Sequence, residues 1–123
     1  MVRLLLSGLR VPLIARQLYL SPDLRNDRAR DIIDLLLLRD LVNAEQSPTA
    51  DELRQACLSL FQARAAEARE LGRPERSWPP IAIAHEHWSR DYSMAATAGG
   101  VTVPLADAIS ELNTWIALID AAG

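Results

Sequence analysis

The sequence has 123 residues, of which 50% are hydrophobic and 24% are charged, and its formal net charge is −3. This length fits a single compact domain, 1–123, with a modest core. The composition excludes a disordered chain and a strongly basic nucleic-acid-binding protein. All 13 basic residues are arginines, which excludes lysine chemistry on a phosphate or as a Schiff base. The single cysteine, Cys57, excludes an internal disulfide and a cysteine-based metal site, and it favours the reducing cytoplasm.

The N-terminal region, 1–20, is apolar, but arginines interrupt its apolar runs. No run reaches the ~18 residues of a membrane span, and a secretory signal would also need a longer unbroken run and a small-residue cleavage site. We therefore expect a cytoplasmic chain with no membrane role. Its first element is expected to be buried, with an extended piece over 2–6 and a short helix over 12–20.

A turn over Ser21–Asp23 precedes the second predicted helix, which begins at the N-cap Asn26 and ends near Val42. At about 100° per residue, its aspartates share one narrow face and most of its aliphatic residues lie on the opposite side. The residues expected to face the core are Ile32, Ile33, Leu36 and Leu37.

The third helix is predicted over 49–70, because Ser47-Pro48-Thr49 supplies a cap and the next residues place acids in the first turn. Gly72-Arg73-Pro74 is expected to end it. Its expected core residues are Leu53, Ala56, Cys57, Leu60, Phe61 and Ala65.

A proline-rich connector near 73–81 contains Trp78-Pro79-Pro80, whose prolines exclude helix. A fourth helix is predicted over 84–97, and the last helix begins near 102–104. The residues expected to point inward are His85, Trp88, Tyr92 and Met94 or Ala95 in the fourth helix, and Leu105, Ala108, Ile109, Leu112, Trp115, Ile116 and Ile119 in the last. The predicted fold is all-α, a helical bundle of about four to five helices.

Two groups of chemically reactive side chains have simple structural interpretations. His85 and His87 are two residues apart and lie on different helix faces, whereas zinc on a helix needs histidines at i and i+4 and a third ligand. Cys57 lies on a predicted core face without an adjacent base, which indicates core packing rather than nucleophilic catalysis. We therefore predict no metal site and no cysteine nucleophile.

The charged start of the second helix is the strongest candidate site. It contains Asp27, Arg28, Arg30, Asp31 and Asp34. Like charges one turn apart cost a few tenths of a kcal/mol, and the dipole at the helix N-terminus offsets part of this cost. Two interpretations remain open. The cluster is either a set of local ion pairs, Arg30 with Asp34 and Arg28 with Asp31, each typically worth less than ~1 kcal/mol, or a functional site.

This segment also carries a resemblance to a known family. Residues 26–38, Asn26-Asp27-Arg28-Ala29-Arg30-Asp31-Ile32-Ile33-Asp34-Leu35-Leu36-Leu37-Leu38, resemble the Arg-x-(Lys/Arg)-Asp-x-x-Asp-Leu motif of the AbiEii/AbiGii-type nucleotidyltransferase toxins. Ile14–Tyr19 is similar to the family's upstream Ile-Ala-x-Lys-Leu-His segment. The segments that follow in the family's order are Asp51–Arg64, the Trp78-Pro79-Pro80 linker, Trp88 with Tyr92, and Leu105–Ile109. The resemblance covers most of this chain, but it corresponds only to the C-terminal half of the proteins in the family.

The resemblance implies a C-terminal helical domain from a bacterial abortive-infection or toxin–antitoxin system. Members of the family transfer nucleotides from an NTP, with magnesium, onto acceptors that include tRNA ends. The resemblance implies that Asp31 or Asp34 is the acidic residue that the C-terminal helices add to the catalytic site. It also implies that Arg28 and Arg30 face phosphate or brace that carboxylate.

Two departures from the family pattern lower the expected activity. Gln17 stands where the family has its lysine, so the resemblance places it among the substrate-binding residues with Arg28 and Arg30, but it cannot supply positive charge to a triphosphate. The family's Gly-Ser-x-x-x-Asp metal motif is missing from the sequence, so we expect the chain to begin after the catalytic domain. Metal-assisted phosphoryl transfer depends on positioned metals and cations. We therefore expect a catalytically incomplete binding or regulatory module.

This module is expected to need no cofactor alone, and to work with Mg²⁺ and an NTP only when another domain completes it. The expected partners are a separately encoded nucleotidyltransferase domain, an antitoxin or a second copy of the chain. RNA is expected to bind only after completion. Two alternatives remain open. One is half of a split nucleotidyltransferase that becomes active with a separate N-terminal domain, and the other is an unrelated helical protein-interaction adaptor.

Overall fold

The structure is a computed structural model that describes residues 11–19, 29–83 and 88–122. Within these ranges the chain forms five helices and no strand, which confirms the predicted all-α fold. The helices are 11–19, α2 (Ala29–Glu45), α3 (Ala50–Leu71), α4 (Trp88–Gly99) and α5 (Leu105–Asp120). None of the described helices combines the length and the apolar character that crossing a membrane requires.

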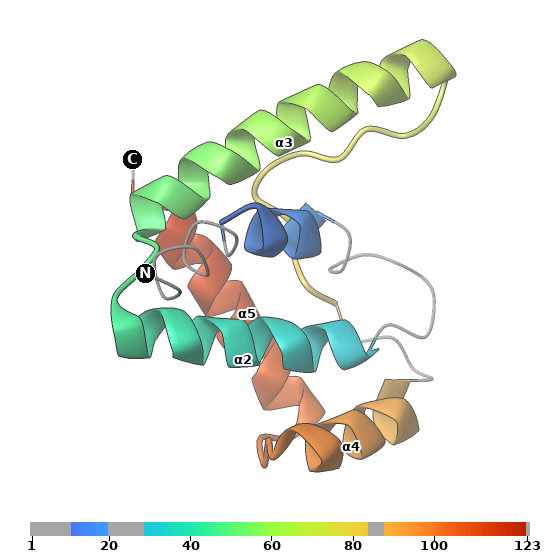
Figure 1. Ribbon diagram of the computed structural model, residues 1–123. Coiled ribbons are helices and arrows are strands. Elements are labelled where there is room, and N and C mark those ends of the chain that lie inside the picture. The colour runs from blue at the N-terminus through green and yellow to red at the C-terminus, as the bar shows by residue number, and fades with distance from the viewer. Residues whose placement is uncertain (1–10, 20–28, 84–87, 123) are drawn as a thin grey trace.

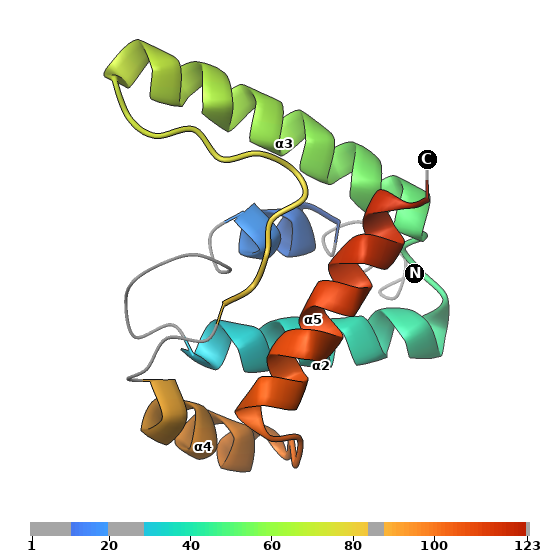
Figure 2. The same cartoon turned by 180° about the vertical axis from the view of Figure 1, so that it is seen from behind.

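The last helix, α5, is the central element of the bundle. It crosses α2 in both views (Figures 1 and 2) and also contacts α3 and α4. Its apolar residues recur every three or four positions, so they form one stripe that the other helices remove from water. The predicted inward residues of α5 are confirmed, with Leu105 and Ile109 half-buried and the others buried: Ala108, Leu112, Trp115, Ile116 and Ile119.

The second helix buries a broader arc than the sequence analysis predicts. Ile32, Ile33 and Leu36 are buried as expected, but Leu37 is 41% exposed and Leu35 is fully buried. Both α4 and α5 pack against α2, so its buried arc is wide rather than a single stripe. Leu35 lies about 60° around the helix axis from Ile32 and falls inside this arc, whereas Leu37 lies about 140° away. The expectation that Leu37 faces the core is therefore wrong.

Local signals set the two ends of α3. The Thr49 hydroxyl accepts a hydrogen bond from the Glu52 N–H, and the Glu52 carboxylate accepts one from the Thr49 N–H, which forms a capping box. At the other end Gly72 has a φ of 66°, and its N–H is bonded to the Ala68 and Arg69 carbonyls. Both ends lie within about one residue of the predicted 49–70.

The fourth helix packs closely on α2. A Cβ atom at Gly99 would lie 3.0 Å from Ile33 Cγ2, so the absent side chain permits this close approach. Tyr92 is buried and Ala95 is half-buried as predicted, whereas Met94 is 65% exposed and the alternative that points Met94 inward is wrong. Ala96, which the sequence analysis did not select, is buried instead.

The proline-rich connector between α3 and α4 has no regular secondary structure over 73–83, as predicted for 73–81. Polar contacts fix it to the bundle. The Trp78 Nε1–H donates to Asp120 Oδ1 at 2.8 Å, and Asn113 makes two hydrogen bonds with the Ala82 backbone, at 2.7 and 3.1 Å. Arg76 donates to the Tyr19 carbonyl, which ties the connector to helix 11–19.

Several predicted features lie outside the described residues: the extended piece 2–6, the turn Ser21–Asp23, the N-cap Asn26, Asp27, Arg28, His85 and His87.

Candidate functional site

The charged start of α2 brings together three of the predicted site residues. Asp31 and Asp34 are both half-buried, and Arg30 is exposed beside them. The charges of Arg30 and Asp31 both act on Asp34, so the three groups form one electrostatic cluster. This cluster occupies the N-terminal end of α2, whose other flank is buried through Ile32 and Leu35.

Burial controls the ionisation of Asp34. It raises the pKa of this carboxyl above its ordinary value of 3.8, and the negative charge of Asp31 acts in the same direction, whereas the positive charge of Arg30 lowers it. Among the described residues, Arg39 of α2 forms ion pairs with Asp40 and Glu111. Arg30 and Asp34, which are both described, form no close ion pair, and the predicted Arg28–Asp31 pair lies partly outside the described residues.

The raised pKa makes Asp34→Asn an informative substitution. Because the folded state binds this proton more tightly than the unfolded state, stability falls as the pH rises from 3.8 through the raised value. At neutral pH the ionised carboxylate is therefore destabilising. We expect Asp34→Asn to raise the Tm slightly at neutral pH, and the gain to shrink as the pH is lowered through that window. Thermal denaturation followed by circular dichroism at several pH values measures both effects.

Asp40→Asn is the matched control on the same helix. Asp40 is exposed and pairs with Arg39 at 2.8 Å, so its removal deletes a favourable interaction and should not raise the Tm. A lower Tm for Asp34→Asn at neutral pH would contradict the assigned effect of burial.

Of the other predicted site residues, Gln17 lies on a different helix, 11–19. Its side chain is half-buried, and its neighbours Ala15 and Leu18 are buried. Arg28 lies outside the described residues. Within the described ranges no group of three or more histidine, cysteine, aspartate or glutamate side chains is placed to hold a metal ion. The expected absence of a metal site stays a prediction, because His85 and His87 also lie outside those ranges.

Cys57 lies in the core, as predicted. It is fully buried, and burial raises the pKa of its thiol to about 12. A thiol with this pKa remains protonated at neutral pH and is a poor nucleophile.

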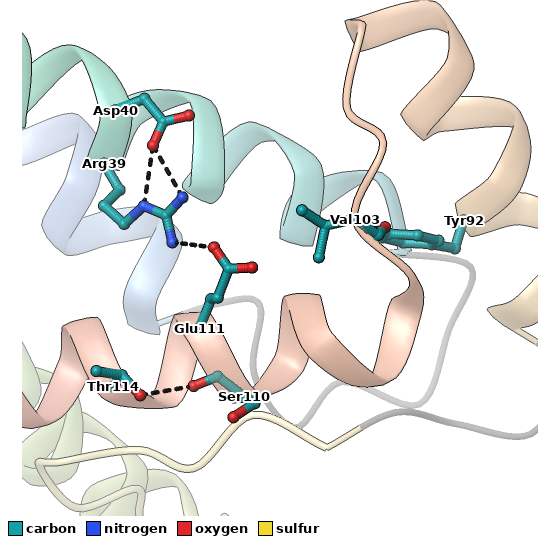
Figure 3. Close-up of polar contacts among 7 residues, drawn as sticks. All are labelled: Arg39, Asp40, Tyr92, Val103, Ser110, Glu111 and Thr114. Carbon is teal, nitrogen blue, oxygen red and sulfur yellow. Dashed lines mark hydrogen bonds and ion pairs between the residues drawn. The ribbon is translucent and has the colours of Figure 1, made fainter.

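A bridge between α2 and α5 fixes the helix that carries the charged cluster (Figure 3). The Arg39 guanidinium donates from Nη1 to Glu111 Oε1 at 2.8 Å, and from Nη2 and Nε to Asp40 Oδ1 at 2.8 and 3.1 Å. Burial alone would lower the pKa of Arg39, but the hydrogen bonds to Glu111 and Asp40 raise it overall. Sequence analysis missed this bridge because its two ends are 72 residues apart.

A second contact in the same view fixes the turn between α4 and α5. The Tyr92 hydroxyl donates a hydrogen bond to the Val103 carbonyl (Figure 3). Burial raises the pKa of the Tyr92 phenol, and the nearby charges of Glu111 and Asp107 add to this effect. The phenol therefore stays protonated and keeps donating this hydrogen bond at neutral pH.

A groove with a volume of about 820 Å³ lies on another part of the bundle, between helix 11–19, α3 and the start of the connector. Most of the residues that line it are apolar, and they include Ala15, Tyr19, Ala56, Leu60, Ala68 and Leu71. Pockets of about 300–1,000 Å³ are typical of binding sites, which are usually apolar with a few placed polar groups.

The polar groups of this groove are mostly arginines. Arg16, Arg64 and Arg73 line it together with one acid, Glu67. Arg64 pairs with Glu67 at 2.9 Å, while neither Arg16 nor Arg73 contacts a carboxylate among the described residues. The groove is therefore locally cationic on a chain with a net charge of −3. Sequence analysis missed it because it joins residues of 11–19 with residues of 56–74.

Comparison with known proteins adds no identification to this geometry. No protein-family model matches the sequence, and no curated protein matches it.

Proposed function

We propose that this chain is the C-terminal helical domain of an AbiEii-like nucleotidyltransferase, that it is catalytically incomplete alone, and that it acts by binding a partner in a toxin–antitoxin or phage-defence system. The observation that supports this proposal most is the cluster of Asp31, Asp34 and Arg30 at the start of α2. Burial raises the pKa of Asp34, so keeping this carboxylate ionised costs stability. Groups held in such an unfavourable state are common at functional sites.

The residues of the cluster fit the ligands that the resemblance implies. Carboxylate oxygens are the protein ligands that Mg²⁺ prefers, and magnesium–nucleotide sites commonly use one or two carboxylates together with substrate phosphates. A guanidinium such as that of Arg30 suits a phosphate oxygen. When bound, Mg²⁺ would stabilise the charge on the phosphoryl group that is transferred. Asp31 and Asp34 would supply carboxylate oxygens beside it, and Arg30 would pair with phosphate.

Rigid support for the cluster comes from the packing of α2. The Arg39–Glu111 bridge joins α2 to α5, and the close approach at Gly99 joins it to α4. A site works best when rigid elements hold its side chains in place. The cluster is therefore a preformed surface that a second domain could complete.

A second candidate function is favoured by the same cluster. In this proposal the chain is half of a split nucleotidyltransferase, and a separately encoded N-terminal domain supplies the metal-binding residues. Asp31 and Asp34 then take part in transfer to RNA rather than only in partner binding. The two proposals differ in whether the assembled pair labels RNA.

A transfer assay separates these functions. The purified chain is incubated with radiolabelled NTPs, magnesium and total tRNA, alone and with the product of the neighbouring gene. We expect no labelled RNA from the chain alone, because Gln17 supplies no positive charge where the family has its lysine and the sequence lacks the family's Gly-Ser-x-x-x-Asp metal motif. Labelling only in the mixture supports the split enzyme, and binding without labelling supports a regulatory module. Labelled RNA from the chain alone would overturn both.

The matched variants test the residues themselves. If the mixture labels RNA, we expect Asp31→Ala with Asp34→Ala to lower the rate by about 100-fold or more, because the carboxylates that would hold Mg²⁺ beside the transferred phosphoryl group are lost. Asp91→Ala, which removes an exposed carboxylate from the first turn of α4, should leave the rate unchanged. If the double variant changes neither labelling nor partner binding, the cluster is only a set of surface charges.

A further inference from the structure

We propose that the groove between helix 11–19 and α3 binds an acidic amphipathic helix of a partner protein. This inference rests on the partner-binding part of the proposed function, and it adds the surface and the chemistry of the partner. It does not involve Asp31 or Asp34.

The shape of the groove suits a helix. Its α3 wall runs from Ala56 to Leu71, a length of about 22 Å or four turns at 1.5 Å per residue. In both views the C-terminal half of α3 extends beyond the other helices, with the connector running back beside it (Figures 1 and 2). On the C-terminal side of Phe61, α3 has one buried residue, Ala68. This half of α3 therefore has a face without a helical neighbour among the described residues.

The floor of the groove suits the apolar stripe of such a helix. Ala15, Ala56 and Ala68 are small and permit close approach of another backbone, while Leu60 and Leu71 offer larger apolar surfaces. Leu71 is 61% exposed, so a large apolar side chain there remains in contact with water. Helices that bind in grooves place apolar anchors at i, i+3, i+4 and i+7.

The charge of the groove selects the partner. Arg16 and Arg73 contact no carboxylate among the described residues, and Glu67, which pairs with Arg64, is the acid among the lining residues. Glutamates or aspartates beside the apolar stripe of a partner helix would complement these cations. Nucleic acid would also be attracted, but its interfaces are more polar and more positively charged than this one, whose floor is apolar. The combination therefore favours an acidic amphipathic helix over RNA.

The test uses a fluorescein-labelled peptide of about 16 residues, with leucines at the i, i+3, i+4, i+7 spacing and glutamates and alanines elsewhere. We expect this peptide to bind the whole chain in a fluorescence anisotropy titration. A control peptide with lysine in place of each glutamate is expected not to bind. Arg16→Glu with Arg73→Glu should weaken binding by about tenfold or more. Leu71→Gln should also weaken it, because it removes part of the apolar floor.

Matched controls report whether these losses belong to the groove. Arg90→Glu makes the same charge change as each of the two arginine substitutions, at an exposed position on α4, which does not contact α3, and should have no effect. Leu118→Gln changes a side chain as exposed as Leu71, 62% against 61%, on α5 outside the groove. The Leu118→Gln variant should bind the peptide as tightly as the unchanged protein does.

Four results would overturn the inference. The first is no binding of the glutamate peptide, and the second is equal weakening of its binding by Arg90→Glu. The third is tighter binding of a single-stranded RNA of matched length, lost in the Arg16→Glu, Arg73→Glu variant, which would assign the groove to nucleic acid. The fourth is self-association in sedimentation velocity that the same variant abolishes, which would assign the groove to a second copy of the chain. The transfer assay contains no peptide, so failure here is separate from failure of the proposed function.

Discussion

Leu112→Ala is expected to lower the free energy of unfolding by about 2–5 kcal/mol, the range for truncating a fully buried leucine. Leu112 is 0% exposed and lies on the face of α5 that packs into the core with Ala108 and Ile116. Because α5 contacts α2, α3 and α4, a cavity at Leu112 weakens the centre of the bundle rather than one helix pair. Domains of this size have total stabilities of about 5–15 kcal/mol. Urea denaturation followed by circular dichroism gives the value.

Leu118→Ala is the control on the same helix. Leu118 is 62% exposed, so the same truncation there leaves no cavity, and its effect should stay within about 0.5 kcal/mol. Both substitutions replace leucine with alanine within α5, so most of the difference in helix propensity cancels. Equal losses at the two positions would contradict the central place of α5 in the core.

Local sequence signals predicted the helices well. The ends of α3 follow from Thr49, Glu52 and Gly72, whose capping interactions involve residues within one turn. The core face of α5 follows from its three-to-four spacing, because one stripe of one helix faces one core. In both cases the information lies within a single element.

Features that depend on several elements could not be predicted in this way. Leu35 rather than Leu37 is buried because α4 and α5 both cover α2, and nothing in the α2 sequence specifies its neighbours. The same reason explains Met94, which lies on an uncovered side of α4. The Arg39–Glu111 bridge joins two helices across the fold.

The two candidate sites differ in the same way, because one lies within a single helix and the other is formed by several elements. The charged start of α2 was predictable, since Arg30, Asp31 and Asp34 lie within two turns of one helix. The sequence could not show that Asp34 is held with a raised pKa, because that depends on burial by other elements. The cationic groove was not predictable at all, since its arginines come from helix 11–19, α3 and the connector.

Phe61→Ala is expected to lower the free energy of unfolding by about 3–5 kcal/mol. Phe61 is 3% exposed and lies between two other rings. Its ring centroid is 5.1 Å from that of Tyr19 and 5.5 Å from that of Trp78, and both pairs are edge-to-face with interplanar angles of 74°. Each such pair contributes about 0.5–1.5 kcal/mol beyond its buried area. This one side chain therefore joins helix 11–19, α3 and the connector, the three elements that form the groove.

Phe61→Leu separates the aromatic contacts from the filled volume. Leucine refills much of the space, so this variant should lose mainly the two ring contacts and cost less than Phe61→Ala. Tyr19 lines the groove and Trp78 anchors the connector to Asp120. Loss of the ring contacts should therefore also shift the tryptophan fluorescence. It should weaken the binding of the acidic peptide under conditions where the protein stays folded. Gln62→Ala, an exposed neighbour on α3, controls for position in the helix. If Phe61→Ala lowered stability while peptide binding by the folded fraction stayed unchanged, the ring stack would support the core without shaping the groove.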